Sequence, residues 1–243
     1  MLALCSFASH GLAARLAATS ALPALPDGRR LSIELGSLAD CDTGGRVWSS
    51  AAVLCGWLAE QPSLRGGSLL ELGSGTGAVG IFAAALGAER VTLSDGGSAA
   101  LLALAEANAE TNCGMWANSD THPQVRVVRH NWGEPLAPED APALCGHSWI
   151  VGSDLTYAAA AHGALCDSLA AQLRRHSPGA TAVLAHQLRL SGDDGEEPTD
   201  ERLASFRAAA GAVGLRVTTL LVDEAAYGGR CVTLLRVECD SQT

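Results

Sequence analysis

Three glycines follow a carboxylate, Glu71, in the stretch ELGSGTG (71–77). Glycines at this density predict a tight turn whose bare backbone a ligand can approach closely. The stretch lacks the lysine of a phosphate-binding P-loop, which excludes that kind of site. It matches the dinucleotide pattern GxGxx[GA] through Gly73, Gly75 and Ala78, but a match of this length is weak by itself.

Two acidic residues bear on the choice of ligand. Glu71 directly precedes the turn, where a pyrophosphate gains nothing from a negative charge but a cofactor with an ammonium and a sulfonium would. Asp95 ends the next apolar segment, RVTLSD (90–95). Because neighbouring parallel strands bring their carboxyl ends to one sheet edge, Asp95 is predicted to accept hydrogen bonds from two ribose hydroxyls. NAD and a phosphate-free adenosine both satisfy that prediction.

Residues further along the chain indicate what lies beside the glycine turn. Trp132 follows the third strand and can lie against an adenine, although a core tryptophan is an equal alternative. In a sheet that reverses direction at its first strand, the fourth strand lies beside the first, which brings Asp154 and Tyr157 next to the turn. A carboxylate and a phenol suit a cationic or amine substrate. The alternative is an Asp that caps the following helix, with the Tyr on its buried face.

Strands and helices alternate along the chain. Apolar segments predict strands at 31–35, 68–72, 90–95, 125–130, 148–153, 181–186, 215–222 and 231–237. Helical spacing predicts helices at 48–61, 78–88, 98–112, 162–175 and 198–214, with Ser98 as an N-cap. This alternation predicts an α/β fold with a doubly wound, mostly parallel sheet. The last two strands are predicted to pair as a hairpin that adds an antiparallel edge.

The composition fits one globular domain, assigned to residues 31–243. The chain has 243 residues, 48% of them hydrophobic, and a mean hydropathy of +0.17. A net charge of −10 argues against nucleic acid and suits a basic protein segment as partner, although a charge that only keeps the protein soluble is at least as good an explanation. Eight cysteines without CxxC pairs indicate reduced thiols, and we expect no metal.

No apolar run reaches the length of a membrane span, so we expect no membrane partner. Residues 1–30 contain no acid before Asp27 and are predicted to be an N-terminal extension, either a transit peptide or a disordered segment. We therefore expect a cytoplasmic protein, or an organellar one if that extension is a transit peptide. We expect a monomer.

Six motifs together resemble a known family. They are TGGRVW (43–48), LLELGSGTGAVGI (69–81), VTLSD (91–95), EANAETN (106–112), NWGE (131–134) and SDLTY (153–157). In this order they resemble class I, seven-strand S-adenosylmethionine-dependent methyltransferases, and among these the protein-lysine methyltransferase group of the methyltransferase-like proteins. The resemblance spans roughly residues 31–238. It implies a Rossmann-like sheet of seven strands, S-adenosyl-L-methionine as cofactor, and a lysine of a protein as methyl acceptor.

The resemblance also implies a role for each residue that matches its motifs. Asp154 and Tyr157 would frame the channel for the target side chain, and they are the candidate catalytic residues. The implied cofactor-binding residues are Trp48 at the pocket entrance, Gly73, Ser74, Gly75 and Gly77 in the turn at the methionine end with Glu71 supporting them, Asp95 at the ribose, Trp132 at the adenine and Ser153 at the end of the fourth strand.

Other functions remain compatible with these residues. The same fold can methylate a small molecule, or a histidine or arginine of a protein, because a fold does not fix the acceptor. An NAD-dependent oxidoreductase is disfavoured, since the chain has no catalytic Tyr-x-x-x-Lys set and no lysine at all: its 16 basic residues are all arginine. A binding module that keeps the fold without catalysis is the remaining alternative.

Overall fold

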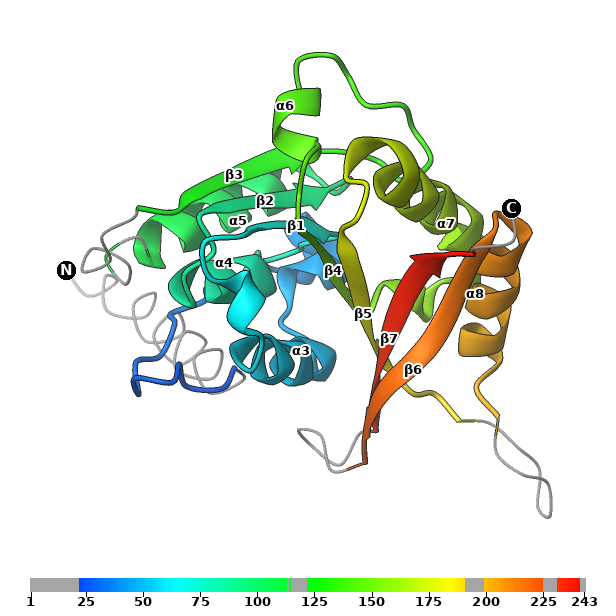
Figure 1. The fold of residues 1–243 in the computed structure, drawn as a ribbon. Helices are drawn as coiled ribbons and strands as arrows, with labels where there is room; N and C mark the ends of the chain where they lie inside the picture. The colour runs from blue at the N-terminus through cyan, green and yellow to red at the C-terminus, as the bar shows by residue number, and fades with distance from the viewer. Residues whose placement is uncertain (1–21, 113, 115–121, 191–198, 225–230, 241–243) are drawn as a thin grey trace.

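A single sheet of seven strands organises the molecule (Figure 1). The computed structural model describes residues 22–112, 114, 122–190, 199–224 and 231–240. The strands follow the order β3-β2-β1-β4-β5-β7-β6. They are β1 Ser68–Leu72, β2 Arg90–Asp95, β3 Gln124–Arg129, β4 Trp149–Ser153, β5 Thr181–Gln187, β6 Leu215–Asp223 and β7 Val232–Cys239. The order reverses at β1, so β4 pairs with β1 as predicted, and the doubly wound α/β fold class is confirmed.

Helices cover both faces of the sheet. The α-helices are α2 Leu38–Cys41, α3 Ser49–Ala59, α4 Ala78–Ala85, α5 Ala99–Asn112, α6 Ala141–Leu144, α7 His162–Ala171 and α8 Glu201–Ala212. Shorter turns are η1 Asp42–Gly45, η2 Pro62–Leu64, η4 Leu155–Tyr157, η5 Ala159–Ala161 and η6 Gln172–His176. Helices α3 and α4 lie on one face of the sheet, and α7 and α8 lie on the other (Figure 1). Alternate residues of β1 enter different cores: Leu69 packs with α3 and α4, and Leu70 packs with α7 and α8. Ser98 accepts a hydrogen bond from the Leu101 N–H, as expected of an N-cap.

The C-terminal hairpin differs in one respect from the prediction. β6 and β7 do pair antiparallel, but β7 lies between β5 and β6 and is antiparallel to both. The edge strand β6 therefore runs in the same direction as β1 to β5, and only the inserted β7 is antiparallel. Insertion buries Val232, Leu234 and Leu235 completely, whereas β6 is largely exposed. The more continuously apolar strand has taken the inner position.

The predicted strand at 31–35 is wrong. The alternation is real, because Leu31 and Ile33 are buried, but this segment joins no sheet. Its backbone bonds instead to the side-chain amides of two asparagines on α5. Asn108 accepts from Glu34 N–H at 2.7 Å and donates to Glu34 C=O at 3.1 Å. Asn112 makes the equivalent pair with the backbone of Ser32. The segment is extended, but its partners are side chains.

The packed part of the chain includes residues before the predicted domain boundary at 31. Leu22 and Leu25 are buried in the same core as α3 and α4. Residues 1–21 of the predicted extension lie outside the described residues. Within the described part of the chain, no helix is long and apolar enough to cross a membrane.

Replacing Asn108 with Ala should destabilise the fold. Its amide bonds to Glu34 and also donates to Thr76 C=O at 3.0 Å, beside the glycine turn. The change leaves these backbone groups without partners, and we expect a loss of about 3 kcal/mol in the free energy of unfolding. Denaturant titration measures it. Glu106→Ala, at an exposed position of the same helix, is the control and should change stability by less than about 0.5 kcal/mol. Equal stability of the two variants would contradict this account.

Candidate active site

The glycine turn between β1 and α4 is held in a conformation that side chains disfavour. Gly73, Gly75 and Gly77 have φ values of 56°, 53° and 78°. A Cβ on Gly75 would lie 2.5 Å from the carbonyl oxygen of Gly44, so the turn lies directly against the segment that contains TGGRVW. Close approach of these two backbone segments shapes one wall of the site.

Glu71 is a structural part of this turn. Its side chain is only 2% exposed, and its Oε2 accepts a hydrogen bond from Gly80 N–H at 2.8 Å. The N-cap of α4 is Gly77, which has no side chain to accept a bond from the helix N-terminus. Glu71 therefore caps the helix from the preceding strand. Burial raises the pKa of Glu71 to about 8, assisted by the charge of Asp95 and opposed by the Gly80 hydrogen bond.

Asp95 fixes the other side of the turn. Its Oδ2 accepts from Gly75 N–H and its Oδ1 from Gly97 N–H, both at 2.8 Å. A carboxylate has about four lone-pair directions, so each oxygen keeps one for a ligand. The neighbouring Ser74 hydroxyl is buried and has no hydrogen-bond partner within the described residues. A polar ligand group in the cavity would satisfy it.

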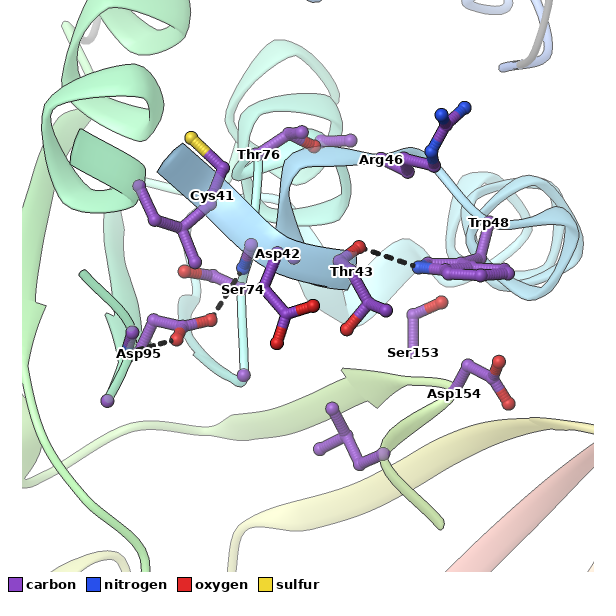
Figure 2. Close-up of a pocket in the computed structure, with 18 of the residues that line it drawn as sticks. Cys41, Asp42, Thr43, Arg46, Trp48, Ser74, Thr76, Asp95, Ser153 and Asp154 are labelled. Carbon is purple, nitrogen blue, oxygen red and sulfur yellow. Dashed lines mark hydrogen bonds between the residues drawn. The ribbon is translucent and has the colours of Figure 1, made fainter. Parts of the chain in front are cut away.

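Two contacts hold the wall of the cavity that is formed by the loop before α3 and by the end of β4. Trp48 donates from its indole Nε1 to Thr43 C=O at 3.2 Å, which closes the loop before α3 (Figure 2). The hydroxyls of Ser50 and Ser153 lie 2.8 Å apart and join α3 to the end of β4. The tryptophan therefore stands over the carboxyl end of β4, on the side of the cavity away from Asp95 (Figure 2).

These walls enclose a cavity of about 620 Å³, in the range of small-ligand sites. Among the predicted site residues, those that line it are Trp48, Glu71, Gly73, Ser74, Gly75, Asp95, Trp132, Ser153, Asp154 and Tyr157. Gly77 does not. A Cβ there would lie 2.7 Å from Leu93 Cδ1, so this glycine serves the packing of α4 on β2. In the described part of the chain, no group of His, Cys, Asp or Glu side chains could hold a metal ion.

Asp154 lies at the end of the cavity opposite Asp95 and pairs with a residue that the sequence did not suggest (Figure 2). Arg189 follows β5 and binds the Asp154 carboxylate through both terminal nitrogens, at 2.9 and 2.5 Å. Asp154 is 5% exposed and has a left-handed φ of 55°. It does not cap the following turn, and Tyr157 is 48% exposed, so the helix-capping alternative is wrong.

A buried chain of hydrogen bonds supports this pair. Asp200, the N-cap of α8, accepts from Arg189 N–H at 2.6 Å, from His186 Nε2 at 2.9 Å and from Leu203 N–H at 2.9 Å. Burial alone would raise the pKa of Asp200, but these donors hold it below its ordinary value. Burial lowers the pKa of His186, whose Nδ1 bonds to the Thr156 hydroxyl at 2.5 Å. The ends of β4 and β5 and the start of α8 are thus tied together.

Several cavity residues were missed from the sequence. They include Asp42, Arg46 and Arg189. Asp42 directly precedes the motif TGGRVW and Arg46 lies within it, but neither residue was assigned a role. Arg189 could have been found by the reasoning that found Asp95, because it follows the carboxyl end of the strand beside β4.

An open α/β sheet with a glycine turn after β1 and an acid at the end of β2 defines a protein that binds a nucleoside-containing cofactor at its switch point. The model of the lysine methyltransferase family matches residues 27–195, and the chain belongs to that family.

Curated relatives agree with this assignment. The chain is 37% identical over 139 residues to protein N-lysine methyltransferase METTL21A of Danio rerio, with 57% of each chain covered. It is 30% identical over 167 residues to EEF1A lysine methyltransferase 3 of Mus musculus, with 67% of this chain and 63% of that relative covered. The aligned part thus spans less than two thirds of each relative's length.

Solved structures show the same fold. Magnesium protoporphyrin IX methyltransferase of Synechocystis PCC 6803, solved with bound SAH, aligns with a TM-score of 0.53 at 16% identity, covering 82% of this chain and 85% of that one. A likeness at this identity shows the shared fold, and the acceptor must be argued from the site itself.

Replacing Glu71 with Gln should change how stability depends on pH. The ordinary pKa of Glu71 is 4.5 and burial raises it to about 8, so between these pH values the native carboxyl keeps a proton that the unfolded chain has released. Its contribution therefore lowers the free energy of unfolding as pH rises through this window, by at most about 1.4 kcal/mol per pH unit.

The glutamine variant has no such proton to lose. Urea titrations of the cofactor-free proteins at pH 5, 6.5 and 8 measure the free energy of unfolding. The value for the variant should increase relative to that of the wild type as pH rises. Parallel profiles would show that Glu71 is ionised throughout.

Proposed function

We propose that this chain is an S-adenosylmethionine-dependent methyltransferase that acts on a lysine of a protein. The observation that carries the proposal is one cavity with two differently built ends. Asp95 and the glycine turn form one end, and Asp154 with Tyr157 forms the other. This cavity belongs to a chain of the lysine methyltransferase family.

The cofactor end suits an adenosine without phosphates. Asp95 keeps acceptor positions for ribose hydroxyls, and Trp132 lines the same cavity and supplies an aromatic surface for adenine. The unpartnered Ser74 hydroxyl suits a polar group of the methionine portion. The named relatives are protein-lysine methyltransferases, and the proposal extends that acceptor class to this chain.

The chain's own residues position and desolvate the acceptor. When bound, the cofactor supplies an electrophilic methyl carbon attached to a sulfonium. The acceptor lysine would have to present a neutral amine to that carbon, and the proton of the amine would leave to water. Asp154 orients the amine and Tyr157 borders its path, so the contribution of the protein is placement.

The cofactor assignment predicts a selective binder. Isothermal calorimetry should give heat with S-adenosylhomocysteine and none with NAD. Asp95→Ala should weaken S-adenosylhomocysteine binding by about 1–3 kcal/mol, because ribose hydrogen bonds and the anchor of the Gly75 N–H are both lost. Asp167→Ala, exposed on α7, should bind like the wild type. Heat with NAD alone would reverse the assignment.

The acceptor assignment predicts labelled lysine. Cell lysate incubated with the enzyme and isotope-labelled S-adenosylmethionine should yield methyl-lysine in protein, identified by peptide mass spectrometry. Asp154→Asn keeps the shape of the side chain but loses the charge that orients the amine, and we expect labelling to fall by roughly 100-fold. Its affinity for S-adenosylhomocysteine should stay within a few-fold of the wild type. Label found on histidine, arginine or small molecules instead of lysine would refute the proposal that lysine is the acceptor.

A further inference from the structure

We propose that Arg189 occupies the target-lysine subsite of the free enzyme as an internal competitor that the substrate must displace. The inference rests on the proposed function and identifies how that site selects its acceptor. It starts from two facts: the Asp154 carboxylate already holds a cationic side chain, and that cation belongs to the chain itself.

The contacts of Arg189 are those that a bound cation would make. Both terminal nitrogens bind the two oxygens of Asp154, and both residues line the cavity. The Asp154 side chain is 4% exposed, whereas the Arg189 side chain is 21% exposed. The carboxylate is therefore the deep partner, and the guanidinium approaches it from the solvent side, as a substrate side chain would.

The main chain of Arg189 is fixed independently of its guanidinium. Asp200 accepts the Arg189 backbone N–H, and Asp200 is itself held by His186 and by the N-terminus of α8. Within the described residues the guanidinium has one further partner, the backbone oxygen of Gln187. The guanidinium can therefore leave Asp154 by rotation about the side-chain bonds of Arg189, while the backbone stays in place.

Displacement by a protonated lysine keeps the charge of Asp154 compensated while the acceptor binds. A buried carboxylate that loses its partner is strongly destabilised, so a neutral or acidic side chain cannot replace Arg189 at low cost. An incoming lysine exchanges one ion pair for another. The pair thus makes the subsite selective for cations before any chemistry occurs.

Arginine suits this role because it cannot be the nucleophile. Its guanidinium stays protonated and has no free nitrogen lone pair, whereas a lysine amine can lose its proton and attack. The chain contains no lysine. A lysine at position 189 would therefore convert the competitor into a substrate, and would be the only lysine in the protein.

Arg189→Lys tests the proposal without knowledge of the natural acceptor. Incubated with S-adenosylmethionine, the purified variant should gain mass in steps of one methyl group, and peptide mapping should place the methyl groups at position 189. Two control variants place the lysine elsewhere. Arg46→Lys changes an exposed residue that lines the same cavity, and Arg216→Lys changes a residue of β6 that pairs with Glu238. Both controls should be methylated at least roughly tenfold more slowly, because proximity sets the rate. Adding Asp154→Asn to Arg189→Lys should slow the mass gain by roughly 100-fold.

The outcomes separate this inference from the proposed function. If Arg189→Lys binds S-adenosylhomocysteine and labels lysate protein but gains no methyl group, Arg189 does not occupy the acceptor subsite and only this inference fails. Equal methylation of the Arg46→Lys control also refutes it. If neither wild type nor variant binds S-adenosylhomocysteine, the proposed function fails and the inference falls with it.

A second variant covers the case in which Arg189→Lys does not fold. Arg189→Ala vacates the subsite, and n-butylamine, present throughout as its ammonium ion, takes the place of the lysine side chain and supplies the cation that pairs with Asp154. Mass spectrometry should detect several-fold more N-methylbutylamine with this variant than with the wild type, whose arginine must first be displaced. The same yield from both proteins, or no product from either, overturns the proposal.

Discussion

The hydrogen bond from Gly80 N–H to the buried carboxyl group of Glu71 ties the end of β1 to the first turn of α4. Without it, the N-terminus of α4 would lack a side-chain acceptor, because Gly77 stands at the cap position. The left-handed glycines need a fixed frame on both sides, and Asp95 supplies the second anchor through Gly75 N–H. These two carboxylates hold the turn against the segment around Gly44, and that contact forms the cofactor wall. A single buried acid thus connects helix capping, turn geometry and the shape of the cavity.

Much of this arrangement could be predicted from the sequence, because the signals are local. The glycine turn, the acid that ends β2 and the SDLTY stretch each directly follow an apolar strand segment. The alternation of elements then requires a doubly wound sheet, and such sheets collect the carboxyl ends of their strands at one edge. No long-range information was needed to bring Asp95, Ser153 and Asp154 to the same cavity.

The features that sequence reasoning missed depend on distant partners. The segment at 31–35 has the alternation of a strand, but its backbone is paired by Asn108, 74 positions away in the chain. The pairing of Arg189 with Asp154 crosses 35 positions and joins two strand ends. Gly77 was grouped with its neighbours by pattern, although its role is the packing of α4 against Leu93. In each case the residue type was compatible with several partners, and only the tertiary fold chose among them.

The two ends of the cavity are supported by different halves of the molecule. The cofactor end depends on β1, β2 and α4 through Glu71 and Asp95. The proposed acceptor end depends on β4, β5 and α8, through the hydrogen bonds that connect Asp154, Arg189 and Asp200. β1 and β4 are neighbours at the switch point, so the halves adjoin along that strand pair, and side chains of both halves pack in the same hydrophobic cores. The hydrogen bonds between Asp154 and Arg189 involve other residues than those of Glu71 and Asp95. Changes to Asp154 or Arg189 can therefore alter the proposed acceptor subsite while the hydrogen bonds of the glycine turn stay in place. This division gives a physical reason why one fold can serve many acceptors, and why the acceptor must be inferred from Asp154 and Arg189 and not from the glycine turn.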